Sequence, residues 1–154
     1  MKKKVPLTKK TWLQKIKNFA KRLLWIQDSP QKIALGLAIG VFWGIMPTFG
    51  FAILFSLPTA LLLKGNRLAA ILGTFANNPL TFPFVYASGI KIGQLILKTT
   101  PVPFSLEFFK VESLLSVGKS LLVGSVFLAI GLALLTYFLV LQIIIWYRAR
   151  HPMK

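Results

Sequence analysis

The sequence predicts an all-α, polytopic helical membrane protein whose helices are broken by proline and glycine and preceded by a basic amphipathic helix. Three long stretches carry no charged side chain, namely residues 33–63, 68–90 and 121–147. The first two are interrupted near their middle, at residues 46–50 and 77–79, whereas the third contains no proline. Uncharged stretches of this length are typical of segments that lie in a bilayer. The composition agrees, because 55% of the 154 residues are hydrophobic and 14% are charged.

The charge distribution indicates which partners to expect. The formal net charge is +16, from 19 Lys and Arg against three Asp and Glu, and the basic residues are concentrated within residues 1–32. Basic segments beside uncharged stretches are typical of cytoplasmic flanks under the positive-inside rule. We therefore expect membrane lipids, anionic ones in particular, as partners, and no nucleic acid.

Residues that could carry chemistry are scarce. Cysteine is absent, and the three acids and His151 lie outside the uncharged stretches. A metal site needs three or four clustered ligands, and a catalytic nucleophile needs a base beside it. We therefore expect no metal, no cofactor and no enzymatic activity.

Residues 1–29 are predicted to form a basic cytoplasmic tail and an interfacial amphipathic helix. Between residues 12 and 26 apolar side chains recur at intervals of three or four, while basic side chains fall mainly on the other side. We expect these basic side chains to bind lipid headgroups: Lys15, Lys17, Lys21 and Arg22. The alternative is that the helix packs on the cytoplasmic face of the protein itself.

A single helical membrane domain is predicted over residues 30–150. Ser29 suits a helix N-cap, and Pro30 suits the first helical position, where its missing N–H leaves no bond unmade. The domain opens with a hairpin over residues 30–63, because its uncharged part would measure about 46 Å as one straight helix, against a hydrocarbon core of about 30 Å. Pro47 lacks a backbone donor, so we expect the chain to break there.

The two arms of the hairpin are predicted over residues 30–46 and 49–63. Three glycines recur at intervals of four in the first arm and form a stripe that lets another backbone approach closely: Gly36, Gly40 and Gly44. We expect this stripe to pack against the second arm. The alternative is a contact with another copy of the chain in a homo-oligomer, or with a partner membrane protein.

A broken helix is predicted over residues 68–98. The turn before it, residues 64–67, carries two positive charges that favour the cytoplasmic side. Asn78 can cap a helix that begins at Pro79, with a separate short helix over residues 68–76 before it. Irregular backbone of this kind is tolerated in a bilayer where it is buried in protein or lines a cavity.

The chain closes with a connector over residues 99–120, a transmembrane helix over 121–147 and a basic cytoplasmic tail over 148–154. The helix would measure about 40 Å, and Trp146 and Tyr147 suit an interface anchor at its end. We expect a multi-pass protein of the bacterial cytoplasmic (inner) membrane, with both termini in the cytoplasm and the connector outside. The alternative is that the broken helix folds back as a second re-entrant hairpin, which would move the C-terminus outside.

Two motifs, at residues 34–50 and 73–83, resemble in order and spacing the uncharacterised bacterial membrane family called domain of unknown function 2062. The resemblance covers residues 29–150. The matching positions are Gly36, Gly40, Gly44, Pro47, Gly50, Asn78, Pro79, Thr81 and Pro83. It implies a small, mostly helical inner-membrane protein, and it implies no reaction and no catalytic residue.

The favoured hypothesis is a small broken-helix carrier or translocase for an anionic or lipid-linked substrate, because carriers use half-helix ends to bind substrates near the midplane. The proposed substrate-binding residues are Pro47, Thr48, Gly50, Asn77, Asn78, Pro79 and Thr81. This hypothesis predicts a polar cavity at the two breaks. In the alternative interpretation, the same residues cap helix ends and satisfy backbone groups that proline leaves free.

The second hypothesis is a non-enzymatic membrane scaffold or assembly protein. It predicts that the two breaks are filled by side chains. It also predicts that the basic helix binds anionic lipid and that a partner membrane protein binds at the glycine stripe.

Overall fold

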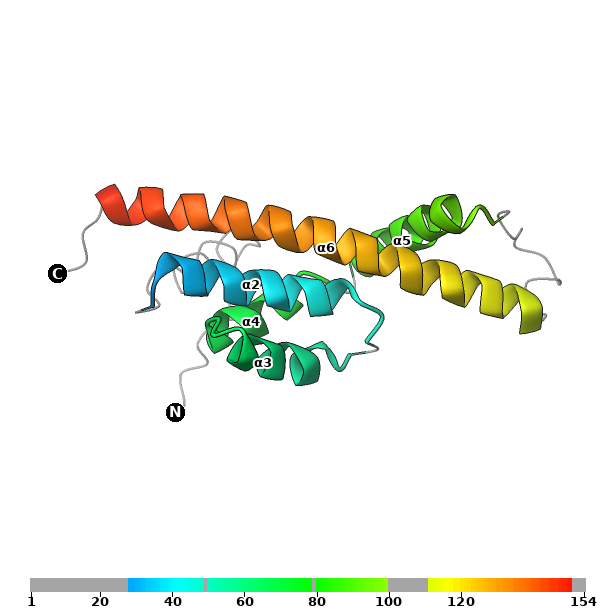
Figure 1. Ribbon diagram of the computed structural model, residues 1–154, viewed down its shortest axis with the longest axis horizontal. Helices are drawn as coiled ribbons and strands as arrows, with labels where there is room; N and C mark the ends of the chain where they lie inside the picture. The colour runs from blue at the N-terminus through cyan, green and yellow to red at the C-terminus, as the bar shows by residue number, and fades with distance from the viewer. Residues whose placement is uncertain (1–27, 49, 79, 100–110, 151–154) are drawn as a thin grey trace, which may run out of the picture.

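A computed structural model describes residues 28–48, 50–78, 80–99 and 111–150. In this part of the chain the fold consists of five helices and no strands, which confirms the all-α prediction. The helices are α2 (Pro30–Ile45), α3 (Ala52–Leu62), α4 (Arg67–Thr74), α5 (Phe82–Leu97) and α6 (Val111–Arg150). Helix α6 runs along the molecule, with α2 beside its C-terminal half and α5 beside its N-terminal half, and α3 and α4 lie on the side of α2 away from α6 (Figure 1).

The predicted hairpin is formed by α2 and α3. The Ser29 side chain accepts a hydrogen bond from the Lys32 backbone N–H at 3.4 Å, so Ser29 is the N-cap that the sequence predicts. At the far end of α3 the chain returns to the start of α2, where the Asn66 backbone N–H donates to the Lys32 carbonyl at 2.8 Å. Helix α3 begins at Ala52 rather than at residue 49, because Gly50 has a φ of +94° that a right-handed helix cannot contain.

The glycine stripe packs against α4, so the prediction that it faces the second arm, residues 49–63, was wrong. A methyl group placed on Gly40 would overlap the Ala70 carbonyl oxygen and lie 2.7 Å from the Gly73 Cα. Gly36 and Gly44 meet the backbones of Asn66 and Thr74 in the same way. The contact is intramolecular, as expected.

Side-chain size explains why α4 rather than α3 meets the stripe. Helix α4 presents small residues that are fully buried, among them Ala69 and Ala70. Helix α3 instead meets α2 through aromatic rings, with Trp43 stacked on Phe55 at a centroid distance of 5.0 Å. Close backbone approach requires small residues on both helices, and α2 and α4 supply them.

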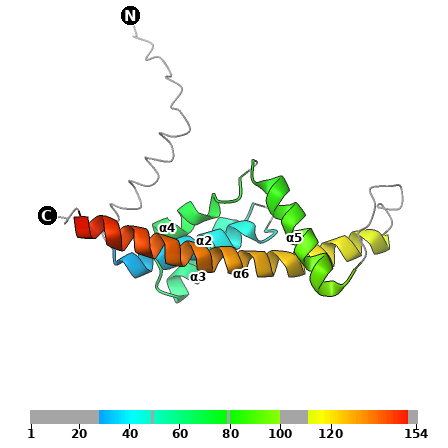
Figure 2. The ribbon, with the colours of Figure 1, turned by 90° about the horizontal axis from the view of Figure 1, so that it is seen from above.

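Helix α5 packs on α6 through a second glycine seam that the sequence analysis did not identify. Methyl groups placed on Gly93 and Gly124 would overlap the carbonyl oxygens of Ser120 and Gly89. Figure 2 shows α5 crossing the N-terminal half of α6 at this seam. Just after the end of α5, the side-chain oxygens of Thr99 and Ser120 lie 3.3 Å apart and share a hydrogen bond.

Helix α6 starts at Val111, so the predicted boundary between a connector (99–120) and a helix (121–147) is not observed. Residues 111–120 contain no proline, and the α5 seam includes Ser120, which explains why the helix continues through them. Residues 100–110 lie outside the described residues. Within the described ranges, Leu115–Arg150 is the one helix that is long and apolar enough to cross a membrane, judged by length and composition.

Substituting Gly40→Ala tests the contact between α2 and α4. The added methyl group has no room against Ala70 and Gly73, and overpacking of this kind destabilises by about 1–3 kcal/mol. Gly131→Ala on α6 is the matched control, because nothing lies within 4 Å of a methyl group there, and the gain in helix propensity predicts equal or higher stability. Thermal unfolding in detergent, followed by circular dichroism, measures both. Equal melting temperatures for the two variants would contradict the contact.

Candidate functional site

The two breaks in the chain lie together and enclose a cavity of about 540 Å³, which we call the break cavity. Because α2 and α4 pack backbone to backbone, the ends of these helices lie at the same level. The cavity is lined by Gly44, Met46, Thr48, Gly50, Ala52, Ile53, Thr74, Phe75, Asn77, Asn78, Phe82 and Tyr86. A cavity therefore lies at the place where the carrier hypothesis predicts one.

The structure places some of the proposed substrate-binding residues at the break cavity and others away from it. Thr48, Gly50, Asn77 and Asn78 line the break cavity. Pro47 and Thr81 are not among its lining residues, and Pro79 lies outside the described residues.

Asn78 and Thr81 cap the start of the α5 segment. The Asn78 Oδ1 atom accepts from the backbone N–H groups of Leu80 and Thr81, at 2.9 and 3.2 Å. The Asn78 N–H in turn donates to the Thr81 hydroxyl at 2.9 Å, which makes a reciprocal capping box. The regular helix begins at Phe82 rather than at the predicted Pro79, and the Phe82 N–H donates to the Asn78 carbonyl at 2.8 Å.

Thr48 has a similar structural role at the first break. Pro47 has no N–H to donate to the Trp43 carbonyl, and the Thr48 hydroxyl donates to that carbonyl at 3.5 Å instead. The hydroxyl groups of Thr48 and Thr81 therefore both bond to backbone, as the alternative interpretation of these residues expects.

Asn77 lines the break cavity and has unused hydrogen-bonding capacity. Its Oδ1 atom is buried and has no hydrogen-bond partner among the described residues. A buried acceptor without a hydrogen bond costs about 1–3 kcal/mol of stability. The residues that line the cavity are all uncharged, and the described residues contain no cluster of acids and histidines that could hold a metal.

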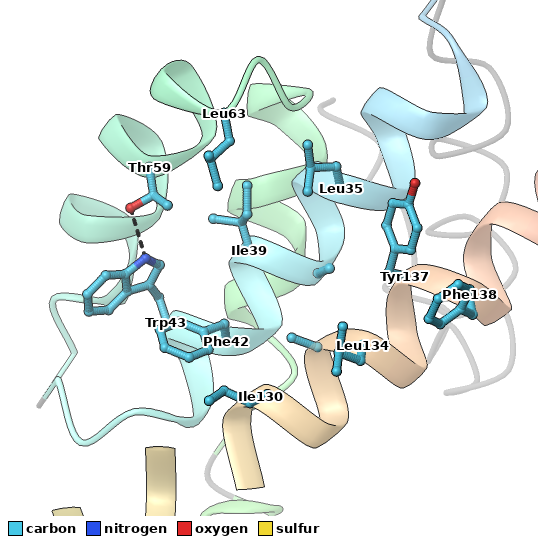
Figure 3. Close-up of a pocket in the computed structure, with 12 residues that line it drawn as sticks. Leu35, Ile39, Phe42, Trp43, Thr59, Leu63, Ile130, Leu134, Tyr137 and Phe138 are labelled. Atoms are coloured by element: carbon cyan, nitrogen blue, oxygen red, sulfur yellow. Dashed lines mark hydrogen bonds between the residues drawn. The ribbon is translucent and has the colours of Figure 1, made fainter. Parts of the chain in front are cut away.

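A second cavity of about 530 Å³, here called the apolar groove, lies between α2, α3 and α6 (Figure 3). It is lined by Leu35, Ala38, Ile39, Phe42, Trp43, Thr59, Leu63, Ile130, Ala133, Leu134, Tyr137 and Phe138. The Trp43 indole N–H donates to the Thr59 hydroxyl at 3.0 Å, and that hydroxyl donates to the Phe55 carbonyl at 2.8 Å. The sequence analysis missed this groove, because its residues are spread over three helices and carry no polar signal.

Three segments of the chain meet at one end of the molecule, around Asp28. The Asn66 amide donates to the Asp28 carboxylate at 3.1 Å, Lys32 pairs with it at 3.5 Å, and Arg148 donates to the Asp28 carbonyl at 2.7 Å. The Asn66 hydrogen bond is the main cause that lowers the pKa of the Asp28 carboxyl below 3.8, and Ser29 and Lys32 lower it further. Asp28 is therefore ionised at neutral pH and holds the start of α2, the turn before α4 and the end of α6 together.

A polar pocket of about 400 Å³ lies at this same end of the molecule. Its lining includes three cations and one carboxylate: Lys32, Lys64, Arg67 and Asp28. The basic residues that the sequence analysis proposed for lipid headgroups, Lys15, Lys17, Lys21 and Arg22, lie outside the described residues. In the sequence, Lys64 and Arg67 indicate topology only, because their place in a pocket depends on the tertiary structure.

The fold and its cavities define a class of protein: a small helical chain whose described residues include one helix of membrane-spanning length and two helix breaks that meet at a cavity. The chain belongs to the bacterial family described as "Uncharacterized protein conserved in bacteria (DUF2062)", which matches residues 13–152. The resemblance found in residues 34–50 and 73–83 is thereby confirmed. No curated protein and no solved structure matches the chain.

Asn78→Ala is expected to lower the free energy of unfolding by about 1 kcal/mol, because it removes the acceptor for two backbone N–H groups. Asn78→Ser keeps an acceptor and should recover most of that loss. Asn77→Ala is the neighbouring control and should not destabilise, because its Oδ1 has no partner to lose. Unfolding followed by circular dichroism compares the three variants. Equal losses at Asn77 and Asn78 would contradict the capping role.

Proposed function

We propose that this protein is a polytopic inner-membrane carrier or translocase that receives the headgroup of a lipid-linked substrate in the break cavity. The observation that carries the proposal is the break cavity itself, lined by both breaks and by Asn77, whose buried Oδ1 atom has no hydrogen-bond partner among the described residues. The scaffold hypothesis predicts breaks filled by side chains. Irregular backbone around a cavity is the arrangement in which broken helices occur at membrane depth.

The chemistry of the cavity narrows the substrate class. Its lining residues carry no charge that could bind a bare anion. The Leu80 and Thr81 N–H groups, which could bind an anion at the start of α5, already donate to Asn78. The Asn77 Oδ1 atom instead requires a donor. Of an anionic and a lipid-linked substrate, these contacts favour a lipid-linked one whose headgroup presents neutral hydroxyl or amide groups.

Exposed apolar side chains support a position in the bilayer. Large hydrophobic residues are exposed along α3, α5 and α6 from Leu115 to Trp146, among them Leu54, Phe84, Leu134, Phe138 and Ile143. A bilayer would cover this surface, whereas a protein in water rarely exposes so much of it. In this placement α6 crosses the membrane, α4 and α5 form a second crossing interrupted at Asn77, and the α2–α3 hairpin enters and returns.

The proposed orientation of the protein in the membrane rests on the charged end of the molecule around Asp28, here called the polar end. The start of α2, the turn before α4 and the end of α6 meet there with four cations: Lys32, Lys64, Arg67 and Arg148. The positive-inside rule places such a cluster in the cytoplasm, together with both termini. The start of α6 then lies on the outer side.

The second candidate function is a scaffold or assembly protein that binds anionic lipid and a partner membrane protein. It is favoured by one observation, that Thr48, Asn78 and Thr81 all bond within the chain. The glycine stripe is buried against α4, so a partner would have to use another surface.

Cysteine labelling tests the orientation, because the chain contains no native cysteine. Arg67→Cys and Lys119→Cys place a thiol at exposed positions at the two ends of the molecule. A membrane-impermeant maleimide is expected to label Lys119→Cys in intact spheroplasts and Arg67→Cys in inside-out vesicles. Labelling of both variants from the same side would exclude the proposed crossings.

Transport is tested with purified protein in vesicles that contain a fluorescent NBD-acyl lipid, whose inner-leaflet fraction is protected from dithionite. With glucosyl diacylglycerol as the headgroup probe, the protein is expected to remove that protection faster than empty vesicles do. Asn77→Leu should abolish the effect, because leucine has a similar size and cannot accept a hydrogen bond. Asn78→Ser, which keeps the cap, should retain it. Absence of acceleration by the wild-type protein, with this probe and with NBD-acyl phosphatidic acid, would favour the scaffold.

A further inference from the structure

We infer that the apolar groove and the polar pocket together form a binding site for one anionic phospholipid, with an acyl chain in the groove and the phosphate at Lys64 and Arg67. This site shares no lining residue with the break cavity. The inference is separate from transport, and it holds for a carrier and for a scaffold.

The groove suits a hydrocarbon chain. Its walls are apolar side chains of α2, α3 and α6, and the indole N–H of Trp43 and the hydroxyl of Thr59 on its wall already have partners. Its α6 wall runs from Ile130 to Phe138, a helical rise of about 12 Å, which corresponds to a large part of an acyl chain. Its volume of about 530 Å³ lies within the usual range for ligand sites.

Residues that are close in sequence line the polar pocket and one end of the groove. Leu63 lines the groove and is followed in the chain by Lys64, which lines the pocket. Leu35 of the groove lies one turn of α2 from Lys32 of the pocket. Figure 3 shows Leu63 and Leu35 near the same end of the groove, with the Tyr137 hydroxyl pointing toward that end.

The pocket has positive charge that the described part of the chain does not balance. Lys32 pairs with the Asp28 carboxylate at 3.5 Å. No described residue forms an ion pair or a hydrogen bond with the side chains of Lys64 and Arg67, and both residues are exposed. Two free cations beside the mouth of an apolar groove complement a phosphate joined to an acyl chain.

Charge also decides between a phospholipid and a second copy of the chain. A second copy carries a net charge of +16 and would bring further positive charge to this end of the groove. A neutral lipid would fill the groove but leave Lys64 and Arg67 without a counter-charge. An anionic phospholipid satisfies both parts of the site.

The fluorescence of Trp43, which lines the groove, tests the inference in the full-length chain. The other three tryptophans are replaced by phenylalanine through Trp12→Phe, Trp25→Phe and Trp146→Phe. Detergent-solubilised protein is titrated with phosphatidylglycerol that carries a brominated acyl chain, and separately with the matching phosphatidylcholine. Phosphatidylglycerol is expected to quench Trp43 at the lower concentration, by about fivefold for each of the two cations.

Matched variants locate the two parts of the lipid. Lys64→Gln with Arg67→Gln should remove the preference for phosphatidylglycerol, whereas Lys98→Gln with Lys119→Gln, away from the pocket, should retain it. Ala133→Phe fills the groove and should remove quenching by both lipids, whereas Ala87→Phe, at an exposed position on α5, should not. Circular dichroism confirms that each variant is folded.

Three results would overturn the inference. The first is equal quenching by both lipids in the wild-type protein, which would leave the cations without a role. The second is an equal loss of the preference for phosphatidylglycerol in the Lys64→Gln, Arg67→Gln variant and in the Lys98→Gln, Lys119→Gln control. The third is a stable dimer, seen by size-exclusion chromatography, in which Trp43 is shielded from both lipids, because the groove would then be covered by a second copy.

Discussion

The backbone contact between α2 and α4 determines where the other parts of this molecule lie. Gly40 on α2 and Gly73 on α4 leave no room for a methyl group between the two helices. Because the helices touch along their length, their ends coincide, and both helices end at a break. Helix α3 follows α2 after one break and α5 follows α4 after the other, so this contact brings the first residues of α3 and α5 to the same cavity. The break cavity lies at one end of this contact, and the end of the molecule around Asp28 lies at the other.

Proline breaks leave backbone groups without partners, and this chain satisfies them with nearby side chains. Thr48 replaces the N–H that Pro47 lacks, and Asn78 and Thr81 bond each other's backbone at the second break. These bonds are local, within a few residues of each proline. They make each break a defined structure, whereas the buried Oδ1 atom of Asn77, a residue that lines the cavity, has no hydrogen-bond partner among the described residues.

Features that depend on neighbouring residues could be predicted from the sequence, and features that depend on the tertiary structure could not. The Ser29 cap, the break at Pro47 and the meeting of the two hairpin ends each follow from a few adjacent residues. The partner of the glycine stripe depends on the size of residues on two other helices, Gly73 of α4 among them, and this comparison needs the tertiary structure. The apolar groove combines residues that are as far apart in the chain as Leu35 and Phe138, so no local pattern indicates it. The start of α6 depends on packing against α5, which no local signal within residues 111–120 reveals.

The position of α5 has a mechanical consequence. Helix α5 packs along α6 at Gly89 and Gly93, and its first turn reaches the core beside α2 through Val85. The second break thus connects two helices that pack on different partners, α4 on α2 and α5 on α6. Phe75 precedes the second break in the chain and Phe82 follows it, and both line the break cavity. A small rotation of α5 about its glycine seam would therefore change the width of the cavity without disturbing the contact between α2 and α4.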